Sequence, residues 1–140
     1  MAREGDREDD EGDITWTFFG FETLARGRPV QEWYDALPGE ARDEAQDTIV
    51  YLQKLPLRLW ALPEYEPLGE GLSEIRFKVN SLNLIYRIYG SFGPKGQRYS
   101  YTFLLGSGKK TKNDRHSKTE AAKRMSKLNN REATVHVFRF

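Results

Sequence analysis

Three consecutive stretches with the two-residue periodicity of β-strands most constrain how this chain can fold. Residues 72–79 read LSEIRFKV, in which Ile75, Phe77 and Val79 alternate with charged residues. Because successive side chains of a strand point to opposite faces, the apolar ones face a core and the charged ones face away from it. Residues 82–92 and 98–105 repeat this pattern after turns at residues 80–81 and 93–96. The three stretches predict an antiparallel meander with one face covered by helices and one open face.

Helical and strand patterns on both sides of the meander complete an α+β protein. Residues 14–21 (ITWTFFGF) and 133–140 (ATVHVFRF) have the β-branched and aromatic composition of strands. Apolar spacing predicts helices over residues 29–37 and 40–55, with an irregular connector over 57–67. A basic helix is predicted from Ser117, which forms a capping box with Glu120. We therefore expect an N-terminal strand, a helical hairpin on a twisted, mostly antiparallel sheet of four or five strands, a C-terminal helix and a last strand.

Charge is divided unevenly along the 140 residues. Residues 1–66 carry a net charge of −9 and residues 67–140 one of +10, although the whole chain has a net charge of only +1. A basic half of this kind favours a polyanionic partner. Residues 1–13 contain seven acidic residues and almost nothing apolar. We expect them to be a disordered acidic tail, and residues 14–140 to form a single domain.

Several functional classes are disfavoured by what the chain lacks. It has no cysteine and only two histidines, so we expect no disulfide, no metal site and no cofactor. No apolar run approaches the ~18 residues of a membrane span, and the N-terminal residues lack the pattern of a signal peptide. These features are compatible with a cytoplasmic protein that has no membrane partner.

The open face of the meander is the candidate binding site. The two-residue period puts cations and an aromatic residue of neighbouring strands on this face, and two lysines follow the glycines at the end of the third strand. Cations and rings on an open sheet are typical of RNA-binding surfaces, but an ordinary solvated sheet face has similar residues. The candidates are Arg76, Lys78, Arg87, Tyr89, Lys109 and Lys110, with Tyr99 or Tyr101 as further aromatic partners.

Four stretches of the chain form a recognisable series. They read VQEWYDALPGEARDEAQDTIVYLQKL, PLGEGLSEIRF, LIYRIYG and FLLGSGKKTKNDRHSKTEAAKRM, and they extend over about 100 residues, from 29 to 128. In order and spacing they resemble the RelE/HigB superfamily of toxin–antitoxin ribonucleases, most closely its phage-derived HigB-like branch. The sequence departs from that superfamily at Ser107 and Gly108, near the position where its members have an aromatic residue.

The resemblance implies a fold, an activity and partners. The fold is the small RelE-like α+β fold, and the activity is that of a cytoplasmic toxin that cleaves mRNA, usually on the ribosome, without a metal. The partners are mRNA, the ribosome and a cognate antitoxin, expected to be HigA-like with a helix-turn-helix. In the expected reaction a ribose 2′-hydroxyl attacks the adjacent phosphate, which requires a base, an acid and cations that stabilise the developing charge.

Matching positions assigns expected roles within that reaction. Arg76 and Arg87 would stabilise the phosphate, and Lys109 or Lys110 would help to bind it. His136 and Glu74 are the candidates for acid and base, with His116 as a second choice, although Glu74 could instead only pair with Arg76. The residues expected to bind RNA are Lys78, Tyr89, Lys109, Lys110, Lys112 and Arg124.

A second class of function remains open from the sequence. A non-catalytic member of the same fold could bind RNA or a protein through the same cationic face. The two alternatives differ in one structural feature. The enzyme needs a titratable acid or base within hydrogen-bond distance of Arg76 and Arg87, and the binding module does not.

Overall fold

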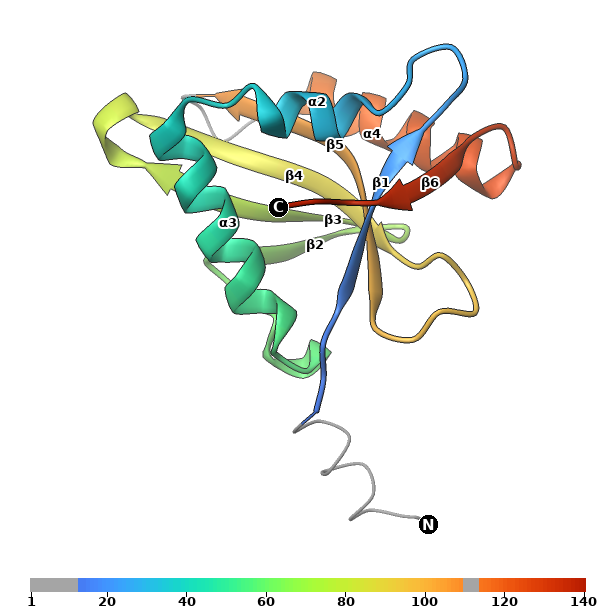
Figure 1. The fold of residues 1–140 in the computed structure, drawn as a ribbon, viewed down its shortest axis with the longest axis horizontal. Coiled ribbons are helices and arrows are strands. Elements are labelled where there is room, and N and C mark those ends of the chain that lie inside the picture. The colour runs from blue at the N-terminus through green and yellow to red at the C-terminus, as the bar shows by residue number, and fades with distance from the viewer. Residues whose placement is uncertain (1–12, 110–113) are drawn as a thin grey trace.

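The computed structural model describes residues 13–109 and 114–140, which form three α-helices and a six-stranded mixed sheet (Figure 1). The α+β class is therefore confirmed. The helices are α2 (Pro29–Asp35), α3 (Gly39–Gln53) and α4 (Arg115–Asn129). The strands are β1 (Thr17–Glu22), β2 (Tyr65–Gly69), β3 (Leu72–Val79), β4 (Leu84–Phe92), β5 (Ser100–Lys109) and β6 (Thr134–Val137). Of the expected acidic tail, residues 1–12 lie outside the described residues.

The antiparallel meander predicted from the alternating stretches is present as β3, β4 and β5. The strand order is β2-β3-β4-β5-β1-β6, so β1 lies between β5 and β6. It pairs parallel with β5 and antiparallel with β6, while all other pairs are antiparallel. The sheet thus has more strands than the expected four or five, and the additional one is β2.

Strand β2 begins in the segment 57–67, which was expected to be an irregular connector, and ends two residues beyond it. It contains Pro67, which argues against a central strand because proline has no backbone N–H. The structure resolves this conflict by the position of β2 at the edge of the sheet. Glu64 accepts a backbone hydrogen bond from Arg76 (2.8 Å), so Pro67, which is three residues later, turns its backbone nitrogen to the outer side. The missing donor therefore breaks no ladder hydrogen bond.

The helical hairpin packs on one face of the sheet, as predicted. The α3 stripe of Ala41, Ala45, Ile49 and Leu52 is fully buried there. Under the hairpin lies a cluster of aromatic rings, and its two tryptophans also satisfy helix-end carbonyls: Trp16 donates to the Leu55 carbonyl (2.8 Å) and Trp60 to the Leu52 carbonyl (3.1 Å). The other rings of the cluster include Phe18, Tyr65, Phe92, Tyr101 and Phe103. Tyr101 is therefore a core residue, and its expected place on the open face is wrong.

The second face of the sheet is not open, because α4 packs across β4 and β5 (Figure 1). The helix buries Ala121 and Arg124, and a second apolar cluster forms between it and the sheet. The buried members of this cluster are Phe21, Leu72, Tyr89, Leu104 and Ala121. The expectation of an open face is thus wrong over β4 and β5, although the alternation that separates the two faces is correct.

Helix α4 also begins earlier than its predicted capping box. The N-cap is Asp114, whose carboxylate accepts a hydrogen bond from the Ser117 backbone N–H (3.4 Å). An aspartate satisfies the free donors of a first helical turn as well as a serine does, so the helix begins at Arg115. Ser117 is consequently a buried residue of the first turn, and the carboxylate of Asp114 is held at the end of β5.

The contact between α2 and β5 leads to a stability prediction. A Cβ atom at Gly106 would overlap with the Trp33 ring, whereas one at Gly39 would have no neighbour within 4 Å. We expect Gly106→Ala to lower the free energy of unfolding by about 1–3 kcal/mol, because the tryptophan must move out of a packed contact. Gly39→Ala is the control and should be neutral or stabilising by up to ~1 kcal/mol. Urea denaturation of both variants tests this, and equal stabilities would contradict it.

Candidate functional site

A pocket of about 460 Å³ opens between the edge of the sheet and the first turn of α4. Strands β2, β3 and β4 form its floor, and charged side chains of both signs supply most of its wall. Its lining residues are Glu66, Leu68, Glu74, Arg76, Tyr89, Asp114, Arg115 and Lys118. We refer to it below as the charged pocket.

A buried carboxylate between two guanidinium groups is the central feature of the charged pocket. Glu74 lies 3.2 Å from Arg76 Nε through one oxygen and 3.7 Å from Arg87 Nε through the other. The register of the meander causes this arrangement, since Arg76 lies directly opposite Arg87 on the neighbouring strand. Arg76 also contacts Glu66 of β2 at 3.1 Å. The side chain of Arg87 is only 1% exposed, so it is held below the pocket rather than in it.

The environment of Glu74 suits a proton acceptor. Burial raises the pKa of Glu74 above its usual value, and the charges of Arg76 and Arg87 partly oppose that rise. Nearby Glu66 raises the same pKa further, whereas Lys118 lowers it. A carboxylate with a raised pKa takes a proton more readily near neutral pH than an ordinary glutamate does.

Tyr89 and Asp114 form a second hydrogen-bonded group on the helix side of the pocket. Asp114 accepts a short hydrogen bond from the Ser107 hydroxyl, and it also hydrogen-bonds to the Tyr89 side chain. Burial, together with the negative charges of Asp114 and Glu74, raises the pKa of Tyr89 well above its usual value. The Tyr89 phenol therefore stays protonated, and its O–H donates a hydrogen bond to the Asp114 carboxylate.

The structure brings together four of the residues expected at the site and adds others. Glu74, Arg76, Arg87 and Tyr89 adjoin one another as the meander predicted. Five further residues were not expected at the site, because they come from β2, from the end of β5 and from the start of α4, where the predicted elements differ from those observed. These residues are Glu66, Ser107, Asp114, Arg115 and Lys118.

Other expected binding residues lie elsewhere. Lys78 is exposed further along β3 and lines a different pocket. Arg124 lies on the buried side of α4, between the helix and the sheet. It donates a hydrogen bond to the Leu104 carbonyl (2.9 Å) and lies over the Phe21 ring, so its role is structural. The backbone of Lys109 ends β5, whereas Lys110 and Lys112 lie outside the described residues.

His136 is not part of the charged pocket. It pairs in register with Gly20 of β1, and its ring occupies the space that a Cβ atom of Gly20 would need. Gly20 shares a face with Phe18, which packs under the helical hairpin. His136 therefore lies on the opposite face of the sheet from Arg76 and Arg87, and it cannot serve as their acid or base. His116 is exposed on the first turn of α4 and does not line the pocket either.

Two further findings concern metals and membranes. Among residues 13–109 and 114–140, no group of three or more histidine, aspartate or glutamate side chains is arranged to hold a metal ion. Within the same part of the chain, no helix is both long enough and apolar enough to cross a membrane.

The state of Tyr89 can be tested by a spectrophotometric titration. Because its pKa is raised, Tyr89→Phe should leave the phenolate absorbance that develops between about pH 9 and pH 11 unchanged in the folded protein. The same titration in guanidinium chloride is the control. In the unfolded chain all seven tyrosines are exposed to solvent and titrate together, so the substitution should remove one seventh of the absorbance change. Loss of one phenolate from the folded protein in this range would contradict the buried position of Tyr89.

The chain matches no model of a protein family, and no curated protein matches it. Membership of the RelE/HigB superfamily therefore stays a prediction from the four sequence motifs, to be judged by the chemistry of the charged pocket.

Proposed function

We propose that this protein is a RelE/HigB-like toxin of a toxin–antitoxin system, with a RelE-like fold, that cleaves mRNA and thereby inhibits translation. The observation that carries the proposal is the position of Glu74, whose carboxylate lies between Arg76 and Arg87 next to an open pocket. A base beside a cation that can reach a phosphate is what attack by a ribose 2′-hydroxyl requires. The two arginines are also among the strand residues at which the sequence matches that superfamily.

The proposed reaction assigns one task to each side chain. Glu74 takes the proton of the 2′-hydroxyl, and the 2′-oxygen attacks the adjacent phosphorus to give a 2′,3′-cyclic phosphate. Arg76, which is partly exposed, stabilises the charge that develops on the phosphate oxygens. Tyr89, whose side chain lines the pocket, donates a hydrogen bond to the departing 5′-oxygen, which takes its proton from solvent at the open side of the pocket. Arg87 is a positioning residue, because it is buried and acts on the substrate only through Glu74.

Binding of the RNA would use the mouth of the same pocket. Arg115 and Lys118 are exposed on the first turn of α4 and line the pocket opposite β3. They would contact phosphates next to the cleaved bond, and the lysine-rich sequence at 109–112 is proposed to contact further phosphates of the RNA. The proposal includes mRNA on the ribosome as substrate, a HigA-like antitoxin as partner and the cytoplasm as the site of action.

Expression in cells, with mapping of mRNA 5′ ends, tests the activity. The wild-type protein should arrest growth and create new 5′ ends, and Arg76→Ala should lower cleavage by about 10²–10³-fold, as expected for loss of one charge that stabilises a transition state. Glu74→Gln should have a similar effect, because the amide cannot accept the proton. Lys123→Ala, on the exposed surface of α4, is the control and should cleave normally.

Two results would overturn the enzymatic proposal. One is the absence of new 5′ ends on expression of the soluble wild-type protein. The other is full cleavage by Glu74→Gln, since the proposed reaction would then lack its base. Circular dichroism of each variant distinguishes loss of activity from loss of fold.

A non-catalytic binding module is the second candidate, and one observation favours it. Three carboxylates, those of Glu66, Glu74 and Asp114, line the pocket and offset its cations.

Purified protein and a short RNA distinguish the alternatives for the ligand. If the cationic mouth binds RNA, its affinity should fall steeply between 50 and 200 mM salt, by about tenfold or more for two or three phosphate contacts. A flat response, or no binding, would favour a protein ligand.

A further inference from the structure

A backbone edge of the sheet is left open beside a second pocket. Strand β2 pairs with β3 only as far as Arg76, where the Arg76 N–H donates to the Glu64 carbonyl. Backbone groups of a strand alternate in direction, so those of Lys78 point to the same side, beyond the end of β2. In the described part of the chain, no backbone group pairs with Lys78 on that side.

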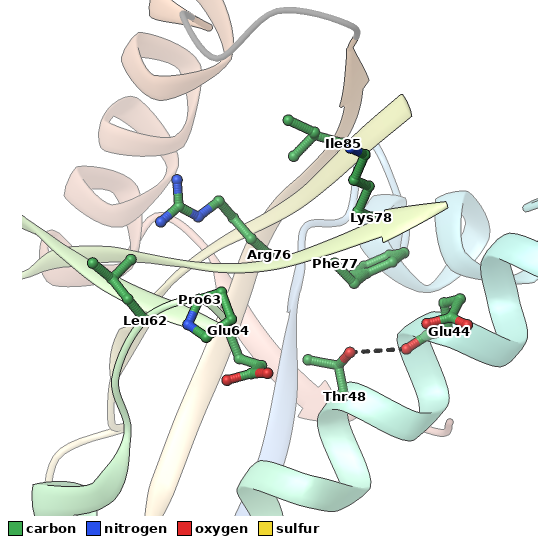
Figure 2. Close-up of a pocket in the computed structure, with 9 residues that line it drawn as sticks. All are labelled: Glu44, Thr48, Leu62, Pro63, Glu64, Arg76, Phe77, Lys78 and Ile85. Carbon is green, nitrogen blue, oxygen red and sulfur yellow. Dashed lines mark hydrogen bonds between the residues drawn. The ribbon is translucent and has the colours of Figure 1, made fainter. Parts of the chain in front are cut away.

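The pocket at this open edge has a volume of about 520 Å³. Figure 2 shows Phe77 pointing toward α3, whereas Arg76 and Lys78 leave the opposite face of β3. Residues from both faces of the sheet therefore line one cavity, which is continuous around the strand edge. The full lining consists of Glu44, Thr48, Leu62, Pro63, Glu64, Arg76, Phe77, Lys78 and Ile85.

A cavity that extends over both faces at a strand edge suits an added strand better than a compact ligand. The side chains of an added strand alternate between the two faces, and its backbone pairs with the free edge. On one face they would meet Phe77, and on the other Ile85 and the side chain of Leu62, which is 62% exposed. Such an exposed leucine beside an unpaired edge gives an incoming strand apolar surface to cover.

The two edges of this part of the sheet differ in how well they are protected. The outer edge of β2 carries Pro67, which cannot donate a hydrogen bond and so discourages pairing. On the open part of β3, the N–H of Lys78 remains available, and the exposed lysine supplies a positive charge beside it. An acidic side chain directly opposite Lys78 would neutralise that charge on the same face of the sheet.

We propose that the open edge of β3 docks an extended segment of a partner protein, which adds a strand to the sheet and carries an acidic residue opposite Lys78. In the docked segment, the residues on either side of this acidic residue point to the α3 side of the sheet, and they are small and apolar so that they fit against Phe77. The docked segment also contacts Arg76, which lines the charged pocket as well. A segment bound at the edge of β3 therefore touches a residue of the candidate site. The docking itself does not depend on whether that site cleaves RNA.

Selection from a library of random octapeptides displayed on phage, against the folded full-length chain, tests the docking. We expect the selected peptides to alternate apolar residues around an aspartate or glutamate. With a synthetic copy of one such peptide at saturation, amide exchange at Lys78, followed by NMR, should slow at least about tenfold, as for a newly formed backbone hydrogen bond.

Charge reversal provides the matched test. Lys78→Glu should lower the affinity for the acidic peptide by about fivefold, which corresponds to the free energy of an exposed ion pair. A peptide with lysine in place of its acidic residue should prefer the variant to the wild-type chain. Lys123→Glu makes the same charge change on the exposed side of α4 and should leave both affinities unchanged.

The following outcomes would overturn the proposal. Selection could yield no binder, or binders that leave amide exchange at Lys78 unchanged. Sedimentation could show that the chain dimerises with Lys78 already protected, which would make a second copy the occupant. Removal of residues 1–12 could expose a Lys78 amide that is protected in the full chain, which would make the chain's own acidic segment the occupant.

Discussion

The candidate site depends on one buried ionic contact, that of Glu74 with Arg76 and Arg87. A charged arginine buried as completely as Arg87 is costly unless a partner of opposite charge lies beside it. The antiparallel register of β3 and β4 supplies that partner without any loop, because Glu74 and Arg76 are two residues apart on one strand and Arg87 is opposite. A shift of this register by one residue would place Arg87 on the opposite face of the sheet from Glu74 and Arg76. The apolar core that fixes the register thus fixes the site as well.

Helix α4 turns this ionic contact into a pocket. By covering β4 and β5 it removes water from Arg87 and Tyr89, and its N-cap carboxylate adds a hydrogen-bond partner for the Tyr89 side chain. The part of β3 nearest β2 stays uncovered, so that Arg76 remains in reach of a ligand while Arg87 does not. Two arginines that are equivalent in the alternating sequence therefore have different tasks in the folded protein.

The sequence allowed the alternation, the helical hairpin and the shared face of Glu74, Arg76 and Arg87 to be predicted, because each follows from a local period. The cover over that face could not be predicted in the same way. The apolar stripe of α4 is short, and nothing local tells whether it packs on the meander or elsewhere. His136 was misjudged for a related reason: its type suits acid–base chemistry, but only the pairing of β6 with β1 determines which face it is on. Pro67 concealed an edge strand, since proline argues against strands in general and less so at an edge.

The position of β1 between β5 and β6 has a consequence for synthesis of the chain. This first strand pairs with β5 and β6, so its partners are encoded roughly 80 and 115 residues later. At a translation rate of 5–20 residues per second, β1 waits on the order of ten seconds before its place in the sheet exists. During that interval its aromatic side chains are exposed, and the meander can form without it. The fold is therefore completed only after the last strand, β6, has emerged from the ribosome. Chains released before that point lack the strand that pairs with the outer edge of β1.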